Sequence, residues 1–501
     1  MVLRLSKTIL YLTPTRQKKY SMKRNILFLL FLLGILNLTF LSGRAQEQTI
    51  CKGLVTCDGI GIKNIVVTDG INFCQTNNKG KYLLKVDKTS NFIYLSSPAG
   101  YLVPVDKSVP QFYKKLNGNT SSQKNDFQLI KNNLDETQHA FIAWADPQIK
   151  SNKEIPFLKD AATDLSDLLK SYKEIPFHGL GCGDIVGDNP ELYDSTKQIL
   201  SNTGIPFYQA LGNHDMKYYG RSNETAQSTF EKHFGPVYYS FNKGEIHYIV
   251  LNNVFYIGRD YFYIGYLPEQ QLEWLEKDLS FVAEESTVVI TFHIPSALGE
   301  KDIKTFDYAN ISKSTSNKKA LYEILKFYNV QLISGHLHCN NNILISPNIF
   351  EHNMSSVCGA WWQGDIAEDG TPKGYGVFNV DGSQISWYYK SIGKKKDYQF
   401  RVYPKGSNLE QLDFITANVW NWDPEWKIFW YENGQKIGEM EAYSGLDPDA
   451  IQAFSNKDEL DYKWIQAKKN NHMFRAKPIS ESAKITIVVI DRFGKVYQNN
   501  L

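Results

Sequence analysis

The hydrophobic positions between residues 136 and 357 switch repeatedly between continuous apolar runs and runs with a helical spacing. Continuous runs that suit buried strands lie at residues 141–145, 177–180, 207–211, 246–251, 288–292 and 330–333. Between several of them, apolar side chains recur every three or four positions, which gives a helix one apolar face. These helical segments lie at residues 158–172, 272–282 and 321–328. Alternating strands and helices predict a layered α/β domain with its functional residues at the carboxyl ends of the strands.

The chain has a different pattern on either side of this α/β segment. Residues 46–132 contain short apolar or alternating runs, separated by Asp-Gly, Lys-Gly and Ala-Gly turn signals, which predict an N-terminal β-sandwich. After residue 357 the helical signal fades, and strand-like runs follow at residues 361–362, 387–389, 428–431 and 485–490. We therefore expect three folded parts, at residues 46–132, 136–357 and 358–501, the last of them a C-terminal β-rich domain.

The first 45 residues have the layout of a secretory signal. Met22, Lys23 and Arg24 form a basic start, residues 26–40 are almost wholly apolar, and Gly43 and Ala45 offer small residues for cleavage. The apolar run of about 15 residues is short for a membrane span, which needs roughly 20. We expect translation to start at Met22 and the mature chain, without a membrane span, to be exported to the periplasm or the extracellular space. The alternative is that this segment is retained as an anchor.

The composition is that of a folded protein and does not indicate a nucleic-acid partner. Hydrophobic residues make up 42% and charged residues 22% of the chain, and the net charge is only +2. The lysines at 394–396 are interpreted as a solvated loop. The 6 cysteines show no regular disulfide spacing. A pairing among Cys51, Cys57 and Cys74 stays open, and Cys182 and Cys339 are expected to be free buried thiols.

A polar group follows five of the predicted strands in the α/β segment. The groups are Asp146, Gly-Asp-Ile-Val-Gly-Asp at 183–188, Gly-Asn-His-Asp at 212–215, His293, and Gly-His-Leu-His at 335–338. Each alone has an ordinary explanation, since Gly-Asp is common in turns and a lone histidine is common in cores. Repeated at five strand ends, they would meet at one edge of the core. Carboxylates, an amide and imidazoles together favour a site for two divalent ions that bind and activate a phosphate group.

These motifs and their order resemble the calcineurin-like metallophosphoesterase superfamily. The family pattern is Asp-x-His, Gly-Asp-x-x-Asp, Gly-Asn-His-Asp/Glu, a lone His, then Gly-His-x-His, and the match covers residues 136–357. The flanks resemble the β domains of exported bacterial members, with Cys-Gly-Ala-Trp-Trp at 358–362 and Gly-Tyr-Gly at 374–376 as cues. The resemblance implies a four-layer α/β/β/α sandwich and hydrolysis of phosphate monoesters or diesters by a metal-bridging hydroxide. The implied cofactors are two divalent ions, Mn, Fe, Zn or Mg.

The resemblance also implies a role for individual residues. Asp184 would bridge the two metals, and His214 would assist the leaving group while Asp215 orients it. The first metal would be bound by Asp146 and His338, and the second by Asn213, His293 and His336.

The sequence departs from the family pattern in its first two motifs. Gln148 stands where the family usually has His, and three residues instead of two separate Asp184 from Asp188. Gln148 remains a candidate ligand of the first metal, whose identity it could tilt toward Mn or Mg. It is also the feature that favours the alternative function, a weakly catalytic or non-catalytic binding protein on the same scaffold.

The sequence does not identify the substrate beyond a phosphate ester. The loops 216–245 and 294–316 are expected to decide between monoester and diester. The candidate substrate contacts are Tyr218, Tyr219, Arg221, Tyr256 and Arg259, and for each a surface or packing role is the competing interpretation.

Overall fold

A computed structural model of the protein describes residues 49–501, apart from 118–119, 121, 261, 299–306 and 481. The predicted secretory signal at 1–45 lies outside the described residues. Within the described part of the chain, none of the helices combines the length and the apolar character that crossing a membrane requires.

The predicted N-terminal β-sandwich consists of two sheets. The first contains β1 (Thr49–Cys57), β2 (Ile60–Gly61), β5 (Lys81–Val86), β7 (Tyr101–Leu102), β11 (Ser122–Lys124) and β12 (Phe127–Lys131). The second contains β3 (Val66–Thr68), β4 (Phe73–Gln75), β6 (Phe92–Leu95) and β10 (Tyr113–Lys115), and a ribbon is formed by β8 (Val105–Asp106) and β9 (Val109–Pro110). Alternate residues of β5 are buried, and these share one core with Ile93 and Leu95 of the second sheet.

Two further sheets form the centre of the α/β region. One has the order β15 (Phe207–Gln209), β14 (Phe177–Gly181), β13 (Gln138–Trp144), β24 (Gly374–Asp381) and β25 (Gln384–Ser391). The other has the order β16 (Tyr239–Lys243), β17 (Ile246–Val250), β20 (Thr287–Thr291), β21 (Asn329–Ser334), β23 (Ile349–Asn353) and β22 (Asn341–Ser346). Neighbouring strands β13, β14 and β15 are parallel, as are β17, β20, β21 and β23, so their carboxyl ends meet at common edges.

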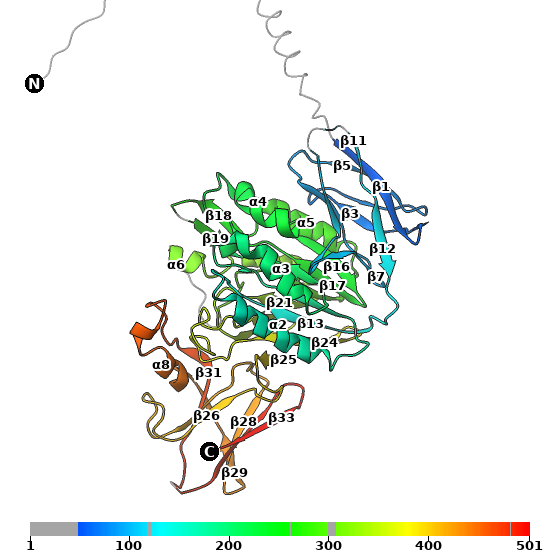
Figure 1. The fold of residues 1–501 in the computed structure, drawn as a ribbon. Coiled ribbons are helices and arrows are strands. Elements are labelled where there is room, and N and C mark those ends of the chain that lie inside the picture. Colours follow the sequence, from blue (N-terminus) through cyan, green and yellow to red (C-terminus); the bar gives the residue numbers. More distant parts are fainter. Residues whose placement is uncertain (1–48, 118–119, 121, 261, 299–306, 481) are drawn as a thin grey trace, which may run out of the picture. The chain divides into compact units, whose positions relative to one another are not determined.

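The side chains of β13 alternate between two cores. The two sheets and the helices beside them (Figure 1) therefore form four layers. Ile142 and Trp144 pack with α2 (Ile155–Leu169) and α3 (Tyr193–Ser201), whereas Phe141 on the other face packs against Tyr248 of the second sheet. The second sheet shares its core with α5 (Glu269–Leu279) and α7 (Lys318–Leu325). The strands and helices predicted for this region are therefore confirmed. Helices α3, α4 (Asn223–Phe234) and α6 (Tyr308–Ile311) were not predicted.

Two strands that follow the predicted boundary at residue 358 join a sheet formed by residues before it. Strand β24 pairs with β13 over residues 374–381, and β25 pairs with β24, so both belong to the first α/β sheet. Pairing between strands more than 200 residues apart leaves no trace in local hydrophobic patterns. The prediction of a strand at Trp361 and Trp362 is wrong, because both residues lie in a turn with φ of 51° and 63°.

The remaining C-terminal part is β-rich, as predicted. One sheet has the order β26 (Arg401–Tyr403), β27 (Ile415–Asn418), β31 (Asn470–Ala476) and β30 (Glu441–Gly445). The other has the order β29 (Gln435–Glu439), β28 (Lys427–Glu432), β32 (Ile485–Ile490) and β33 (Val496–Asn500), and α8 (Pro448–Ala453) lies beyond β30 in the chain. A strand β18 (Val254–Gly258) pairs with β19 (Phe262–Gly265) in the α/β region. The cysteines of the described chain are all free thiols.

Candidate metal centre

The six predicted ligands that match the family pattern all follow strands of the two α/β sheets. Asp146 and Asp184 follow β13 and β14, Asn213 follows β15, His293 follows β20, and His336 and His338 follow β21. All are buried except His336, which is half-buried. The edge formed by these parallel strands therefore gathers carboxylates, an amide and imidazoles from residues up to 192 positions apart.

Asp184 lies at the centre of this group. Its Oδ1 accepts a hydrogen bond from the His214 backbone N–H at 2.8 Å, and its Oδ2 lies 3.4 Å from His293 Nε2. One ligand atom each from Asp184, His293 and His336 falls within 4.8 Å of the other two. A carboxylate with both oxygens directed to different neighbours is suited to bridge two cations.

Each of the three histidines is held by a backbone carbonyl on the side away from the centre. His293 Nδ1 donates to the Cys182 carbonyl at 2.8 Å, His336 Nε2 to the Ser312 carbonyl at 3.0 Å, and His338 Nδ1 to the Gly359 carbonyl at 3.1 Å. A donor committed to a carbonyl fixes the tautomer and leaves the other ring nitrogen with a free lone pair. All three imidazoles therefore present lone pairs to the site, as metal-binding histidines do.

Four acceptor atoms at and around His293 face one another, and this arrangement requires a positive charge between them. His293 Nε2 lies 2.9 Å from Asn213 Oδ1, 3.2 Å from His336 Nδ1 and 3.4 Å from Asp184 Oδ2. In the neutral tautomer all four atoms are acceptors, and such a cluster is stable only with a proton or a cation among them. The residues of this half of the site therefore fit a divalent ion.

The other half of the site is formed by Asp146 and His338. His338 Nε2 lies 3.6 Å from Asp146 Oδ1, and both Asp146 oxygens accept the backbone N–H of His336, at 3.1 and 2.9 Å. The ring of Trp361 stacks on His338 with centroids 4.3 Å apart and an angle of 23° between the planes. Nothing in the sequence pattern singled out Trp361 as a neighbour of the site.

Gln148 is turned into the site, although it is not the histidine that the family pattern expects. Its Nε2 donates to Asp184 Oδ2 at 2.7 Å, while its Oε1 is buried and has no hydrogen-bond partner among the described residues. A buried amide oxygen without a partner is costly, and a bound cation would satisfy it. Gln148 is thus placed where a ligand of either metal, through its oxygen, is chemically reasonable.

The prediction that Asp215 orients His214 is wrong. The His214 Nδ1–H donates to Asp188 Oδ1 at 2.8 Å, so Asp188 is the residue that orients this ring. Asp215 instead accepts the backbone N–H groups of Gly212 at 2.9 Å and Ile185 at 3.1 Å, and the Tyr193 hydroxyl at 3.1 Å. It therefore fixes the two loops that carry Asp184 and Asn213.

The electrostatics of the site follow from burial and close charges. Burial alone would raise the pKa of Asp184, but His293 and His214 beside it lower it. Burial alone would lower the pKa of His293, but Asp184 raises it to about 9. Burial and the neighbouring His293 lower the pKa of His336 to about 3, and burial with Asp184 raises the pKa of Asp215 to about 7. In the metal-free protein, a proton on His293 Nε2 thus supplies the positive charge that the surrounding acceptor atoms of Asn213, His336 and Asp184 require.

Several ligands have a backbone conformation that favours glycine. The φ angles are 50° at Asp146, 39° at Gln148, 52° at Asp184, 72° at His336 and 53° at His338. Left-handed conformations of such residues cost about 1–3 kcal/mol each and persist where the surrounding structure enforces them. Gly212 allows the loops to approach, because a Cβ there would lie 2.0 Å from the Asp184 backbone nitrogen.

The predicted substrate contacts divide into two groups. Tyr218 lies beside the site: burial raises the pKa of its hydroxyl, and the charges of Asp188 and Asp184 raise it further. The Tyr256 hydroxyl donates to the Tyr218 carbonyl. Tyr219 is 74% exposed, and the guanidinium of Arg259 lies over its ring. Arg221 is exposed. Tyr263 was not predicted, but its ring packs edge-on against His336 with centroids 6.0 Å apart.

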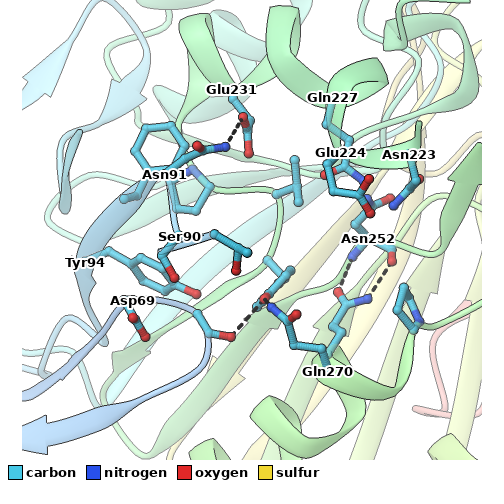
Figure 2. A pocket seen from close by; sticks show the side chains of 18 of the residues that line it. Asp69, Ser90, Asn91, Tyr94, Asn223, Glu224, Gln227, Glu231, Asn252 and Gln270 are labelled. Atoms are coloured by element: carbon cyan, nitrogen blue, oxygen red, sulfur yellow. Dashed lines mark hydrogen bonds between the residues drawn. The ribbon is translucent and has the colours of Figure 1, made fainter. Parts of the chain in front are cut away.

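A separate cavity of about 170 Å³ lies between the N-terminal strands and helix α4 (Figure 2). Asn91 donates to Glu231 across it at 3.0 Å, and Tyr94, Glu224 and Gln227 also line it. The predicted site residues all lie in the described part of the chain, and none of them lines this cavity. It is a polar junction between two regions and not the place of the metal chemistry.

Comparison with known proteins agrees with this site. Three family models match in chain order: the N terminal of calcineurin-like phosphoesterase at residues 49–132, calcineurin-like phosphoesterase at 159–340, and the C terminal of calcineurin-like phosphoesterase at 351–497. The fold is thus that of a metallophosphoesterase. The protein belongs to the calcineurin-like phosphoesterase family, whose members are phosphoric ester hydrolases that use divalent metal ions.

The curated relatives include a serine/threonine-protein phosphatase, CPPED1. The Homo sapiens protein is 30% identical over 171 residues, and the Pongo abelii protein is 31% identical over the same length. Each match covers 32% of this chain and 52% of the relative. The chain therefore spans about half the length of the curated relatives that it matches.

Solved structures with a similar arrangement are more distant. A dimetal phosphatase from Danio rerio is 16% identical, with 51% of this chain and 97% of that chain covered and a TM-score of 0.38. The purple acid phosphatase PPD1 from yellow lupin is 11% identical, with 66% and 68% covered and a TM-score of 0.37.

Proposed function

We propose that the protein hydrolyses phosphate monoesters or diesters with two divalent metal ions. The observation that carries this proposal is the set of three histidines, each anchored to a backbone carbonyl, with His293 and His336 presenting lone pairs beside Asp184 and His338 presenting one beside Asp146. Such an arrangement is built for cations, and carboxylate, amide and imidazole donors together suit Mn, Fe, Zn or Mg.

Asp184 would bind both ions, and each ion would have further ligands of its own. Asn213, His293 and His336 would bind one ion. Asp146, His338 and the amide oxygen of Gln148 would bind the other. When bound, the ions would neutralise phosphate oxygens and make a water molecule nucleophilic near neutral pH.

His214 is placed to assist the leaving group. Its Nδ1 is committed to Asp188, which leaves Nε2 free, and the side chain is 27% exposed. Burial alone would lower its pKa, but Asp184 and Asp188 raise it, and this favours the protonated ring. A protonated imidazole can donate to the departing oxygen.

The test uses the full chain loaded with Mn²⁺, assayed on p-nitrophenyl phosphate and its bis-ester. We expect turnover that a chelator removes and Mn²⁺ restores. We further expect His214→Ala to lower kcat by about 100-fold, and Asp188→Asn to lower it by about tenfold, as positioned proton donors contribute 10²–10⁴-fold. The exposed Asp194, whose carboxylate pairs with Lys197 at 2.9 Å, gives the control Asp194→Asn. Metal-loaded protein that cleaves neither compound would favour the alternative, a non-catalytic binding protein on this scaffold.

We also propose that the protein acts outside the cytoplasm. The proposal rests on the basic start at Met22–Arg24, the apolar run that follows it and the small residues before Gln46. N-terminal sequencing of the mature protein from fractionated cells tests it. A mature chain that begins near Gln46 in the periplasm or medium is expected, and an uncleaved chain in the cytoplasm would contradict it.

A further inference from the structure

A wall of aromatic side chains, formed by Trp361, Trp362, Trp464 and Tyr462, borders the metal centre on the His338 side. Trp361, which stacks on His338, and the following Trp362 both have left-handed φ angles, 51° and 63°. The Trp362 indole N–H donates to the Pro147 carbonyl at 3.0 Å, and its ring stacks on Phe157 with centroids 5.8 Å apart. The fold thus holds two bulky residues in a costly conformation to keep Trp361 against a metal ligand.

The C-terminal region extends this wall toward solvent. The Trp464 ring packs edge-on against the Trp361 ring with centroids 4.3 Å apart. The centroid of the Tyr462 ring lies 5.9 Å from that of Trp464. Trp464 is 54% exposed, and it is the one exposed tryptophan in the described chain. Single exposed apolar residues are common on protein surfaces, but this one continues a cluster that reaches a metal ligand.

Lys150 connects the other end of the wall to the metal centre. Its Nζ lies 4.7 Å above the Tyr462 ring, and its stem packs on Gly187, where an added Cβ would lie 2.3 Å from Lys150 Cγ. Gly187 precedes Asp188, and the Lys150 charge acts on His214. Lys150 is half-buried, and no carboxylate of the described residues forms an ion pair with its Nζ, because Glu154 accepts only its backbone N–H. An unpaired cation beside a phosphate site is suited to hold an anionic group.

We propose that Lys150, Tyr462 and Trp464 form a substrate subsite for phosphate esters and phosphoanhydrides with a second anionic group followed by a planar aromatic ring. The order of contacts gives the order of groups: phosphate at the metal centre, anion at Lys150, ring on the Tyr462 and Trp464 side chains. Stacking on exposed aromatic residues recognises any planar ring and adds cation–π character near a lysine. This inference rests on the proposed phosphoesterase function.

The experiment compares three substrates of the Mn²⁺-loaded full chain: ADP, methyl diphosphate, which lacks the ring, and methyl phosphate, which also lacks the second anion. Hydrolysis of either diphosphate adds one water across the P–O–P bond, with its oxygen on the terminal phosphorus and a proton on the leaving phosphate. We expect Trp464→Ala to lower the ratio of kcat/KM for ADP to that for methyl diphosphate by about tenfold, and Lys150→Met to lower the methyl diphosphate to methyl phosphate ratio similarly. The aromatic control Phe493→Ala, at a residue 45% exposed, should change neither ratio.

Equilibrium binding separates failure of the subsite from failure of the proposed function. Calorimetry with the non-hydrolysable methylene analogue of ADP should give a Kd that rises about tenfold in Trp464→Ala. Binding that depends on Trp464 without hydrolysis of any ester would retain the subsite and overturn the phosphoesterase function. Hydrolysis with both substrate ratios unchanged in Trp464→Ala and Lys150→Met would overturn the subsite and retain the function.

Discussion

The proton on His293 gives a prediction about the metal-free protein. His293 is fully buried and lies 3.4 Å from Asp184, and the close carboxylate raises its pKa from 6.5 to about 9. A histidine whose folded pKa is raised stabilises the fold fully below the unfolded pKa, and this stability is lost as pH rises through the folded pKa. At about 1.4 kcal/mol per pH unit, up to roughly 3 kcal/mol should be lost between pH 6.5 and pH 9.

Thermal melts of the chelator-treated full chain at pH 6.5 and pH 9 measure this loss. We expect Tm to fall by a few degrees as pH rises, and we expect Asp184→Asn to remove at least half of that fall. His214 contributes to the same fall in Tm, because Asp184 also raises its pKa. The pKa of His338 is raised by Cys358 and Asp146 instead, so its contribution to the fall should remain in Asp184→Asn.

Metal ions should reverse the pH dependence, because a ligating histidine must be neutral and the ion takes the place of its proton. Added Mn²⁺ should therefore raise Tm more at pH 9 than at pH 6.5. The exposed control Asp194→Asn should keep the full slope of the parent. A parent Tm that is equal at both pH values in chelator, or an Asp184→Asn protein that keeps the whole slope, would refute the pairing of His293 with Asp184.

Two further predictions concern the site loops and the polar junction. Gly212→Ala should abolish metal binding and lower activity by more than 100-fold, because the added Cβ would lie 2.2 Å from Asp184 Oδ1. Metal analysis and kinetics measure both effects. Gly438→Ala, whose added Cβ would have its nearest neighbour at 3.8 Å, is the control that should change neither. Burial raises the pKa of Glu231 to about 7, so its ionised form weakens the fold as pH rises from 4.5 through 7. Glu231→Gln should raise Tm by a few degrees at pH 8 but not at pH 4.5, whereas Glu224→Gln, at an exposed residue, should do so at neither; equal shifts at both pH values would contradict this.

The sequence alone determined the α/β core and the candidate ligands. A continuous apolar run followed by Asp, Asn or His marks the end of a buried parallel strand, so local patterns predicted both the strands and the residues at their carboxyl ends. The same patterns predicted the helices of residues 158–172, 272–282 and 321–328, because an apolar face with a helical period is a property of a short segment.

Only the tertiary structure decided which side chains meet. Nothing local shows that β24 completes the sheet of β13, that Asp188 and not Asp215 holds His214, or that Trp361 covers His338. These contacts depend on register and on loop conformations with positive φ, which are enforced by packing across the whole domain and not by the residues themselves. The sequence therefore determined the chemistry available to this protein, and the folded structure decided how those groups are paired and which side chains border them.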